Sequence, residues 1–200
     1  FKISRYEQAF AEFSYLADEG DATAYYYLGK MYSQGLGVPK DDTMAVEYYK
    51  KAESAYNIDA AYELAQILLS NVTSADTPEF ETGLRYLKRA AYAGQADALY
   101  ELGEMFAQGK NVEQNYQNSF GYYLMSSLRG HAGAQLKLGV HYLLGWGTPQ
   151  DFENAVKWIS RSARQGYVYA QQKLAELRST HPAVLNFPDA YAWYSIIAAY

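Results

Sequence analysis

The 200-residue sequence contains no cysteine, and it has no long uninterrupted hydrophobic run. The absence of cysteine excludes disulfides, thiolate metal sites and a cysteine nucleophile. Without a run of about 18 or more apolar residues, the sequence predicts no membrane-spanning helix. Positive charge is also scarce, because 17 Lys and Arg stand against 22 Asp and Glu, which gives a net charge of −5. Nucleic acid and anionic membranes are therefore disfavoured as partners.

What the sequence does have is an internal repeat. Its anchor is an alanine that recurs after 36 or 38 residues, followed four residues later by a leucine and then by a small residue. The alanines are Ala24, Ala60, Ala98, Ala134 and Ala170, and the leucines are Leu28, Leu64, Leu102, Leu138 and Leu174. A fixed period of this length indicates a helical solenoid.

The segment 131–166 shows the repeat most completely. Ala134, Leu138 and Tyr142 follow a helical spacing and share one face. Gly145-Trp146-Gly147 then interrupts the pattern, because glycine adopts left-handed backbone conformations easily. A second helix is predicted after Asp151, a residue type that favours helix N-termini. One repeat is therefore a helix, a turn and a returning antiparallel helix.

Applied to the whole chain, this pattern predicts about eleven helices in a single domain, 1–200. The boundaries are a half repeat at 1–20, full repeats at 21–57, 58–94, 95–130 and 131–166, and a C-terminal repeat with an insertion at 167–200. The turn Ser70–Pro78 is longer than the others, and the last helix is expected at Asp189–Tyr200. Because 1–20 reads as a returning helix without its partner, we expect further repeats or a capping helix upstream.

The pattern A-x-x-x-L-G-x-x-Y-x-x-G-x-G, followed by A-x-x-W/Y-Y/I-x-K/R-A/S-A, resembles the Sel-one-like repeat. Its fullest copies are Ala24–Gly37 with Ala45–Ala52, and Ala134–Gly147 with Ala155–Ala163. The resemblance implies an all-α, right-handed α/α superhelical solenoid of antiparallel helix pairs, similar to tetratricopeptide proteins. It also implies that the first helix of each pair lines a concave groove.

Candidate partner-binding residues follow from that orientation. They lie two and six residues after the anchoring alanines, and an apolar cluster in the fourth repeat adjoins them. The set is Tyr26, Lys30, Tyr62, Gln66, Tyr100, Glu104, Leu136, Val140, Leu143 and Leu144. Leu136, Val140, Leu143 and Leu144 are expected to form an exposed apolar patch, which usually marks an interaction site. Packing between repeats is the alternative explanation for the tyrosines.

The other motifs in the sequence do not predict a nucleotide, metal or catalytic site. Gly103–Lys110 resembles a phosphate-binding loop, but it has five residues between the glycines and lacks the hydroxyl residue after the lysine. The three histidines have unrelated spacings, so no metal site is predicted. We expect His141 at the surface or in a hydrogen bond between repeats. No catalytic arrangement stands out, so we expect neither enzymatic activity nor a cofactor.

The sequence therefore predicts a protein-interaction scaffold that binds a protein or peptide partner in its groove. Two alternatives stay open. One is binding of a carbohydrate or cell-wall polymer, as in envelope-assembly members of the family. The other is β-lactam binding or hydrolysis, as in a cysteine-rich branch, although this chain lacks the cysteines. The compartment is not determined by the residues, and the resemblance favours the bacterial periplasm or secretion over the cytoplasm.

Overall fold

The computed structural model describes residues 5–70, 72 and 75–198. Within these residues all regular structure is helical, with eleven α-helices and one short 3-10 helix. The chain divides into two compact units, 1–95 and 96–200, and each has its own core. The prediction of an all-α chain of about eleven helices is therefore confirmed.

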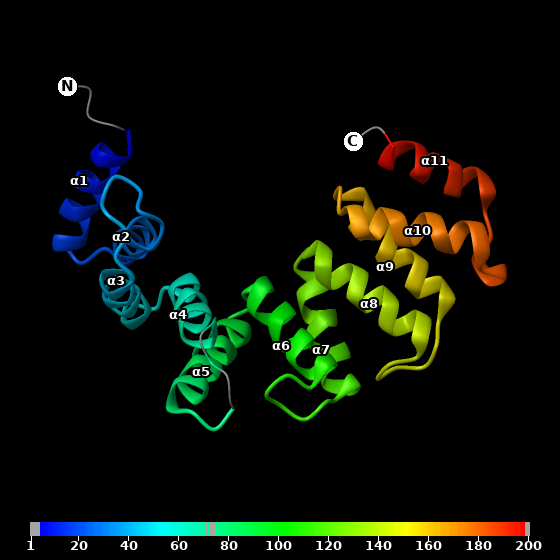
Figure 1. Ribbon diagram of the computed structural model, residues 1–200, viewed down its shortest axis with the longest axis horizontal. Coiled ribbons are helices and arrows are strands. Elements are labelled where there is room, and N and C mark those ends of the chain that lie inside the picture. Colours follow the sequence, from blue (N-terminus) through cyan, green and yellow to red (C-terminus); the bar gives the residue numbers. More distant parts are fainter. Residues whose placement is uncertain (1–4, 71, 73–74, 199–200) are drawn as a thin grey trace. The chain divides into compact units, whose positions relative to one another are not determined.

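The first unit contains α1 to α5 (Figure 1), with bounds Arg5–Asp18, Ala22–Gln34, Asp42–Ser54, Ile58–Ser70 and Pro78–Tyr92. The second contains α6 to α11, with bounds Ala96–Gln108, Tyr116–Leu128, Ala132–Leu144, Phe152–Arg164, Val168–Thr180 and Phe187–Ile197. The 3-10 helix Pro182–Val184 lies between α10 and α11. In each repeat a first helix (α2, α4, α6, α8 or α10) packs against the returning helix that follows it.

The repeated alanines and leucines form the core of both units. All five anchoring alanines and all five leucines are buried. In unit 1, Tyr49 of α3 packs with Ala45, Ala52 and Leu64. In unit 2, Tyr123 of α7 packs with Ala134, Leu138 and Trp158. Each copy of the repeat thus contributes its alanine and its leucine to the core of the unit in which it lies.

The small residue after each leucine allows the two helices of a pair to approach closely. A Cβ atom built on Gly139 would lie 2.5 Å from Ile159 Cγ1 and 2.9 Å from the carbonyl oxygen of Ala155. On Gly29 and Gly103 the added atom would lie 2.7 Å from the rings of Tyr49 and Tyr123, respectively. The predicted close packing at these glycines is confirmed.

Polar side chains fix the helix ends. The hydroxyls of Ser126 and Ser162, on the returning helices, donate to the carbonyls of Ala96 and Ala132, each at 2.7 Å. These acceptors are the first residues of α6 and α8, so the same bond recurs in two successive repeats. Asp151 accepts from the amide of Asn154 and begins α9, as the sequence predicts.

The last helix differs from its predicted bounds. It begins at Phe187 instead of Asp189, because Asn186 caps it by accepting from the Asp189 amide at 3.1 Å and proline is tolerated in a first turn. The predicted end at Tyr200 and part of the Ser70–Pro78 turn lie outside the described residues. The returning helix of that repeat begins at Pro78, one residue before its predicted start.

Candidate functional site

The predicted groove residues lie on first helices, within each unit separately. In unit 1, Tyr26 and Lys30 lie on α2, and Tyr62 and Gln66 lie on α4. In unit 2, Tyr100 and Glu104 lie on α6, and four residues lie on α8: Leu136, Val140, Leu143 and Leu144. All of them are half-buried except Leu144, which is exposed.

The tyrosines two residues after the alanines pack against the returning helix of their own repeat. The ring of Tyr26 lies 6.0 Å from that of Tyr49, and the ring of Tyr100 lies 5.9 Å from that of Tyr123. Burial, reinforced by the nearby carboxylate of Glu63, raises the pKa of Tyr26 to about 12. These rings therefore contribute to packing within their own repeats.

Glu104 carries the densest set of polar contacts among the predicted groove residues of unit 2. Its carboxylate accepts from the Tyr123 hydroxyl, from Lys137 Nζ at 2.8 Å and from Gln108 Nε2 at 2.7 Å. Burial acts to raise the pKa of Glu104, but the hydrogen bonds from Lys137 and Tyr123 outweigh it and lower that pKa below 4.5. Glu104 is therefore a charged carboxylate held in a fixed position.

A pocket of about 390 Å³ lies beside this carboxylate. It combines an ion pair, apolar walls and aromatic rings contributed by α6, α7, α8 and the turn after α8. The lining residues are Glu104, Ala107, Gln108, Tyr116, Tyr123, Leu136, Lys137, Val140, His141 and Trp146. Three predicted groove residues, Glu104, Leu136 and Val140, thus meet at one pocket.

The aromatic wall of the pocket is a stacked pair. The rings of Tyr116 and Trp146 lie 4.7 Å apart and within 14° of parallel. Trp146 lies in the turn between Gly145 and Gly147, and 38% of it is exposed. An exposed indole fixed against a second ring can bind an apolar or planar group of a ligand.

His141 holds that turn in place. Its ring is buried, and its Nδ1–H donates to the Trp146 carbonyl at 2.9 Å. Its Nε2 lies 3.4 Å from the hydroxyl of Ser119 on α7, the returning helix of the preceding repeat. Burial lowers the pKa of His141, so the neutral ring is favoured. Of the two positions expected for His141, the structure shows the hydrogen bond between repeats.

The predicted apolar patch is largely covered. Leu136 and Leu143 pack against a core cluster on α9 and α10 that contains Ile159 and Leu174. Leu144 is 49% exposed. The other three are half-buried instead of exposed, and for Leu136 and Leu143 the reason is that the following repeat packs against the same helix. Of these, Leu136 and Val140 still reach the pocket wall.

The sequence analysis missed Tyr116, Trp146 and Lys137. An aromatic residue between two turn glycines was a usable signal for Trp146. For Lys137 the signal was its position in the repeat. It lies three residues after the anchoring alanine of its repeat, and it pairs with Glu104, six residues after the anchoring alanine of the preceding repeat. Lys30 and Glu63 occupy the same two registers in unit 1. Burial raises the pKa of Glu63, and the positive charge of Lys30 opposes that rise.

In both units a positive and a negative side chain therefore interact across two successive repeats. The earlier repeat supplies the positive charge in unit 1 and the negative charge in unit 2. At the next such position Val140 replaces the charged residue. Lys173 holds the matching register on α10, and its Nζ contacts Glu176 of the same helix at 3.0 Å. The apolar Val140 thus leaves one side of the pocket without an ion pair of this kind.

Across the described ranges, no cluster of His, Asp or Glu has the arrangement needed to hold a metal ion. None of the helices described is both long and apolar enough to cross a bilayer. The pocket is lined by aromatic, apolar and ion-paired side chains, which is the composition of a recognition site.

The repeated helix pairs and this pocket define a helical-repeat scaffold. The Sel1 repeat family model matches residues 22–57, 58–95, 96–131 and 132–167. The chain therefore belongs to the Sel1 repeat family, and its fold is the α/α solenoid of that family.

Solved structures agree. A Sel1 repeat protein from Oxalobacter formigenes superposes with a TM-score of 0.86 and 27% identity, over 96% of this chain and 79% of that one. A protective antigen of uropathogenic Escherichia coli with an SLR fold gives a TM-score of 0.84 and 25% identity, over 97% of this chain and 41% of that one. Proteins of this fold typically act as scaffolds for protein interactions.

Two curated relatives are alginate biosynthesis proteins. AlgK of Azotobacter vinelandii is 31% identical over 101 residues, which is 50% of this chain and 21% of that protein. AlgK of Pseudomonas syringae pv. tomato is 33% identical over 99 residues, which is 50% of this chain and 20% of that protein. The matched segment thus spans about a fifth of each relative.

Proposed function

We propose that this chain is a non-enzymatic scaffold that binds a protein partner through the groove formed by its first helices. The pocket beside Glu104 carries the proposal. It offers an aromatic wall at Tyr116 and Trp146, an apolar wall at Leu136 and Val140, and a fixed carboxylate. Aromatic side chains that become buried when a partner binds commonly contribute about 2 kcal/mol or more to protein binding.

The partner segment that fits best has an apolar side chain next to a polar one. The apolar side chain would lie between Val140 and Trp146, and the polar one would reach the Glu104–Lys137 pair. The tyrosines Tyr26, Tyr62 and Tyr100, with Lys30 and Gln66, would extend the contact along the first helices.

Site-specific cross-linking tests this proposal. A photo-crosslinking residue in place of Leu144, which is exposed at the groove end of α8, should capture a protein in cells that produce the full chain. The matched control places the same residue at Leu128 on the returning helix α7, which is 68% exposed. Equal capture of the same protein from both positions, or capture of none from position 144, would contradict a partner in the groove.

A second candidate function is binding of a carbohydrate polymer in the same groove. The alginate biosynthesis relatives favour it, and the stacked rings of Tyr116 and Trp146 suit a sugar ring. The third possibility, β-lactam binding or hydrolysis, belongs to a branch whose cysteines this chain lacks. Turnover of nitrocefin by the purified protein would revive it, and its absence would favour the scaffold.

The single continuous solenoid over 1–200 is part of the proposal, as is an extracytoplasmic location. Support for the first comes from four consecutive family matches with no intervening gap. The second rests on the resemblance to envelope proteins alone.

A further inference from the structure

One residue in unit 1 adopts a backbone conformation that glycine occupies elsewhere. The returning helices are followed by Gly20, Gly94, Gly130 and Gly166, all with φ between 84° and 93°. The matching residue after α3 is Tyr56, with φ of 64°. A side chain in the left-handed region costs free energy. Tyr56 is also 84% exposed, so packing recovers little of that cost.

The ring of Tyr56 borders a pocket of about 230 Å³ at the end of α3, α4 and α5. Arg89 of α5 also lines this pocket, and its guanidinium forms an ion pair with the largely buried carboxylate of Glu53. Half of the Arg89 side chain remains exposed. The guanidinium is thus anchored on one side and open on the other.

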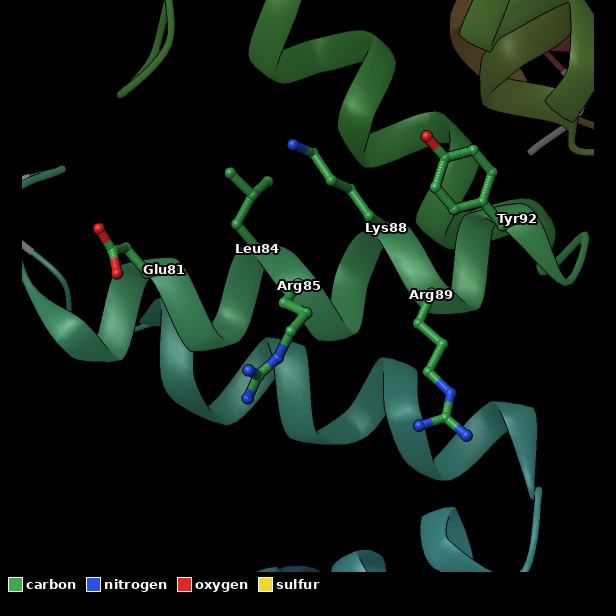
Figure 2. A pocket seen from close by; sticks show the side chains of 6 residues that line it. All are labelled: Glu81, Leu84, Arg85, Lys88, Arg89 and Tyr92. Carbon is green, nitrogen blue, oxygen red and sulfur yellow. The ribbon is translucent and has the colours of Figure 1, made fainter.

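Arg89 also lines a second, wider hollow of about 570 Å³ over α5. Figure 2 shows Arg85 and Arg89 extending to one side of the helix, and Leu84, Lys88 and Tyr92 extending to the other. Three cations and one carboxylate, Glu81, line this hollow, although the whole chain has a net charge of −5. Tyr92 is 84% exposed, like Tyr56.

The two hollows share Arg89, and exposed phenol rings and cations border them, with Arg85 and Arg89 on one side of α5 and Lys88 on the other. Guanidinium groups bind carboxylates in bidentate geometry. A phenol ring offers a flat apolar face to the C–H groups of a sugar ring and a hydroxyl to its polar groups. Both tyrosines are 84% exposed, so neither ring is the buried anchor that peptide contacts commonly use.

We propose that this surface, defined by Tyr56, Arg85, Lys88, Arg89 and Tyr92, binds a carboxylate-bearing sugar chain. The cations contact the uronate carboxylates, and the two tyrosines contact the faces of the sugar rings. The site lies on returning helices and the turn after α3. It does not depend on the proposed groove.

Calorimetric titration of the full chain tests this site, with an oligomer of mannuronic acid as the probe. A neutral cello-oligosaccharide of equal length and an oligoglutamate peptide serve as comparisons. We expect the uronate oligomer to bind, the neutral sugar not to bind, and added salt to weaken the contact because the cations are exposed. The double variant Arg85→Gln/Lys88→Gln should lose about tenfold or more in affinity.

The matched control is Lys157→Gln/Arg164→Gln, which removes two exposed positive charges from another returning helix, α9. It should bind as the parent does. No binding of the uronate oligomer at low salt, or equal losses in the two double variants, would overturn the proposal. Tighter binding of oligoglutamate than of the uronate would replace the sugar with an acidic peptide and would also overturn it.

Tyr56→Gly gives an independent measurement. Glycine relieves the backbone cost at φ of 64°, so the melting temperature should rise while uronate affinity falls. A rise in both would show that the Tyr56 ring takes no part in binding and would remove it from the site. A loss of stability would show that the left-handed backbone of Tyr56 costs no free energy, which would contradict the proposal.

Discussion

At the scale of single residues, the tight approach of α8 and α9 depends on Gly139. A methyl group there would meet Ile159 and the Ala155 carbonyl at 2.5 and 2.9 Å. We expect Gly139→Ala to destabilise the chain by about 1–3 kcal/mol, since the backbone oxygen has little room to move. Urea unfolding of the parent and the variant measures the difference.

Gly121 on α7 is the matched control, because a methyl group there would have no neighbour within 4 Å among the described residues outside its own helix backbone. Gly121→Ala should stabilise by about 0.5–1 kcal/mol, the usual gain at an unobstructed helix interior. If the two substitutions changed the free energy of unfolding equally, close helix contact would not explain the glycine at 139.

The buried ring of His141 makes stability depend on pH. Its pKa in the folded chain is lowered by burial, so the unfolded chain takes up a proton first as pH falls. The stabilisation is therefore complete above about pH 6.5 and declines below it, by at most about 1.4 kcal/mol per pH unit. Denaturant titrations between pH 7 and pH 5 measure this slope.

His141→Gln removes the titrating group and keeps an N–H that can donate to the Trp146 carbonyl. The variant should show a shallower decline in stability over the same pH range than the parent. Identical slopes for the two proteins would mean that His141 is not the group responsible.

At the scale of helices, the pairing of charges across repeats suggests a substitution that should alter partner binding while leaving the fold stable. Val140 stands where Glu104 stands one repeat earlier, and Lys173 stands where Lys137 does. Val140→Glu should therefore let Lys173 form the pair that Glu104 and Lys137 form at 2.8 Å. Stability should change by no more than about 1 kcal/mol.

The same substitution places a charge in the apolar wall of the pocket, so capture of a partner from position 144 should be lost. Val140→Leu is the control, since it keeps the wall apolar and should keep the capture. A variant Val140→Glu that binds normally would remove the pocket from the proposed interface.

Helix positions were predictable from the sequence, whereas the chemistry on their surfaces was only partly so. Ala134 and Leu138 recur at every repeat because each copy must fill the same buried space. The pair between Glu104 and Lys137 was missed because its sign reverses relative to Lys30 and Glu63, which hides it from a search for identical residues. The burial of Leu136 was missed because it depends on the next repeat.

At the scale of the whole molecule, the same periodicity that predicted the fold says little about the binding surfaces. The pocket beside Glu104 is lined by α6, α7, α8 and a turn. Its Tyr116 and Trp146 do not recur at the matching positions of the other repeats. Residues such as Tyr56 depart from the repeat, and a departure becomes visible only after the backbone is known. Both proposed binding sites therefore include residues that are exceptions to the repeat.

Nearest-neighbour coupling between repeats predicts how truncated chains behave. Residues 1–130 retain α1 to α7 but lose Ala134, Leu138 and Trp158, which cover Tyr123. We expect this fragment to be helical and less stable than the full chain. Residues 1–95, which end at the boundary of unit 1, should also fold, since that unit has its own core. Circular dichroism with urea unfolding measures all three chains. If the full chain unfolded at the same urea concentration as residues 1–95, the repeats would not be coupled as one solenoid, and loss of all helix in residues 1–130 would contradict modular folding.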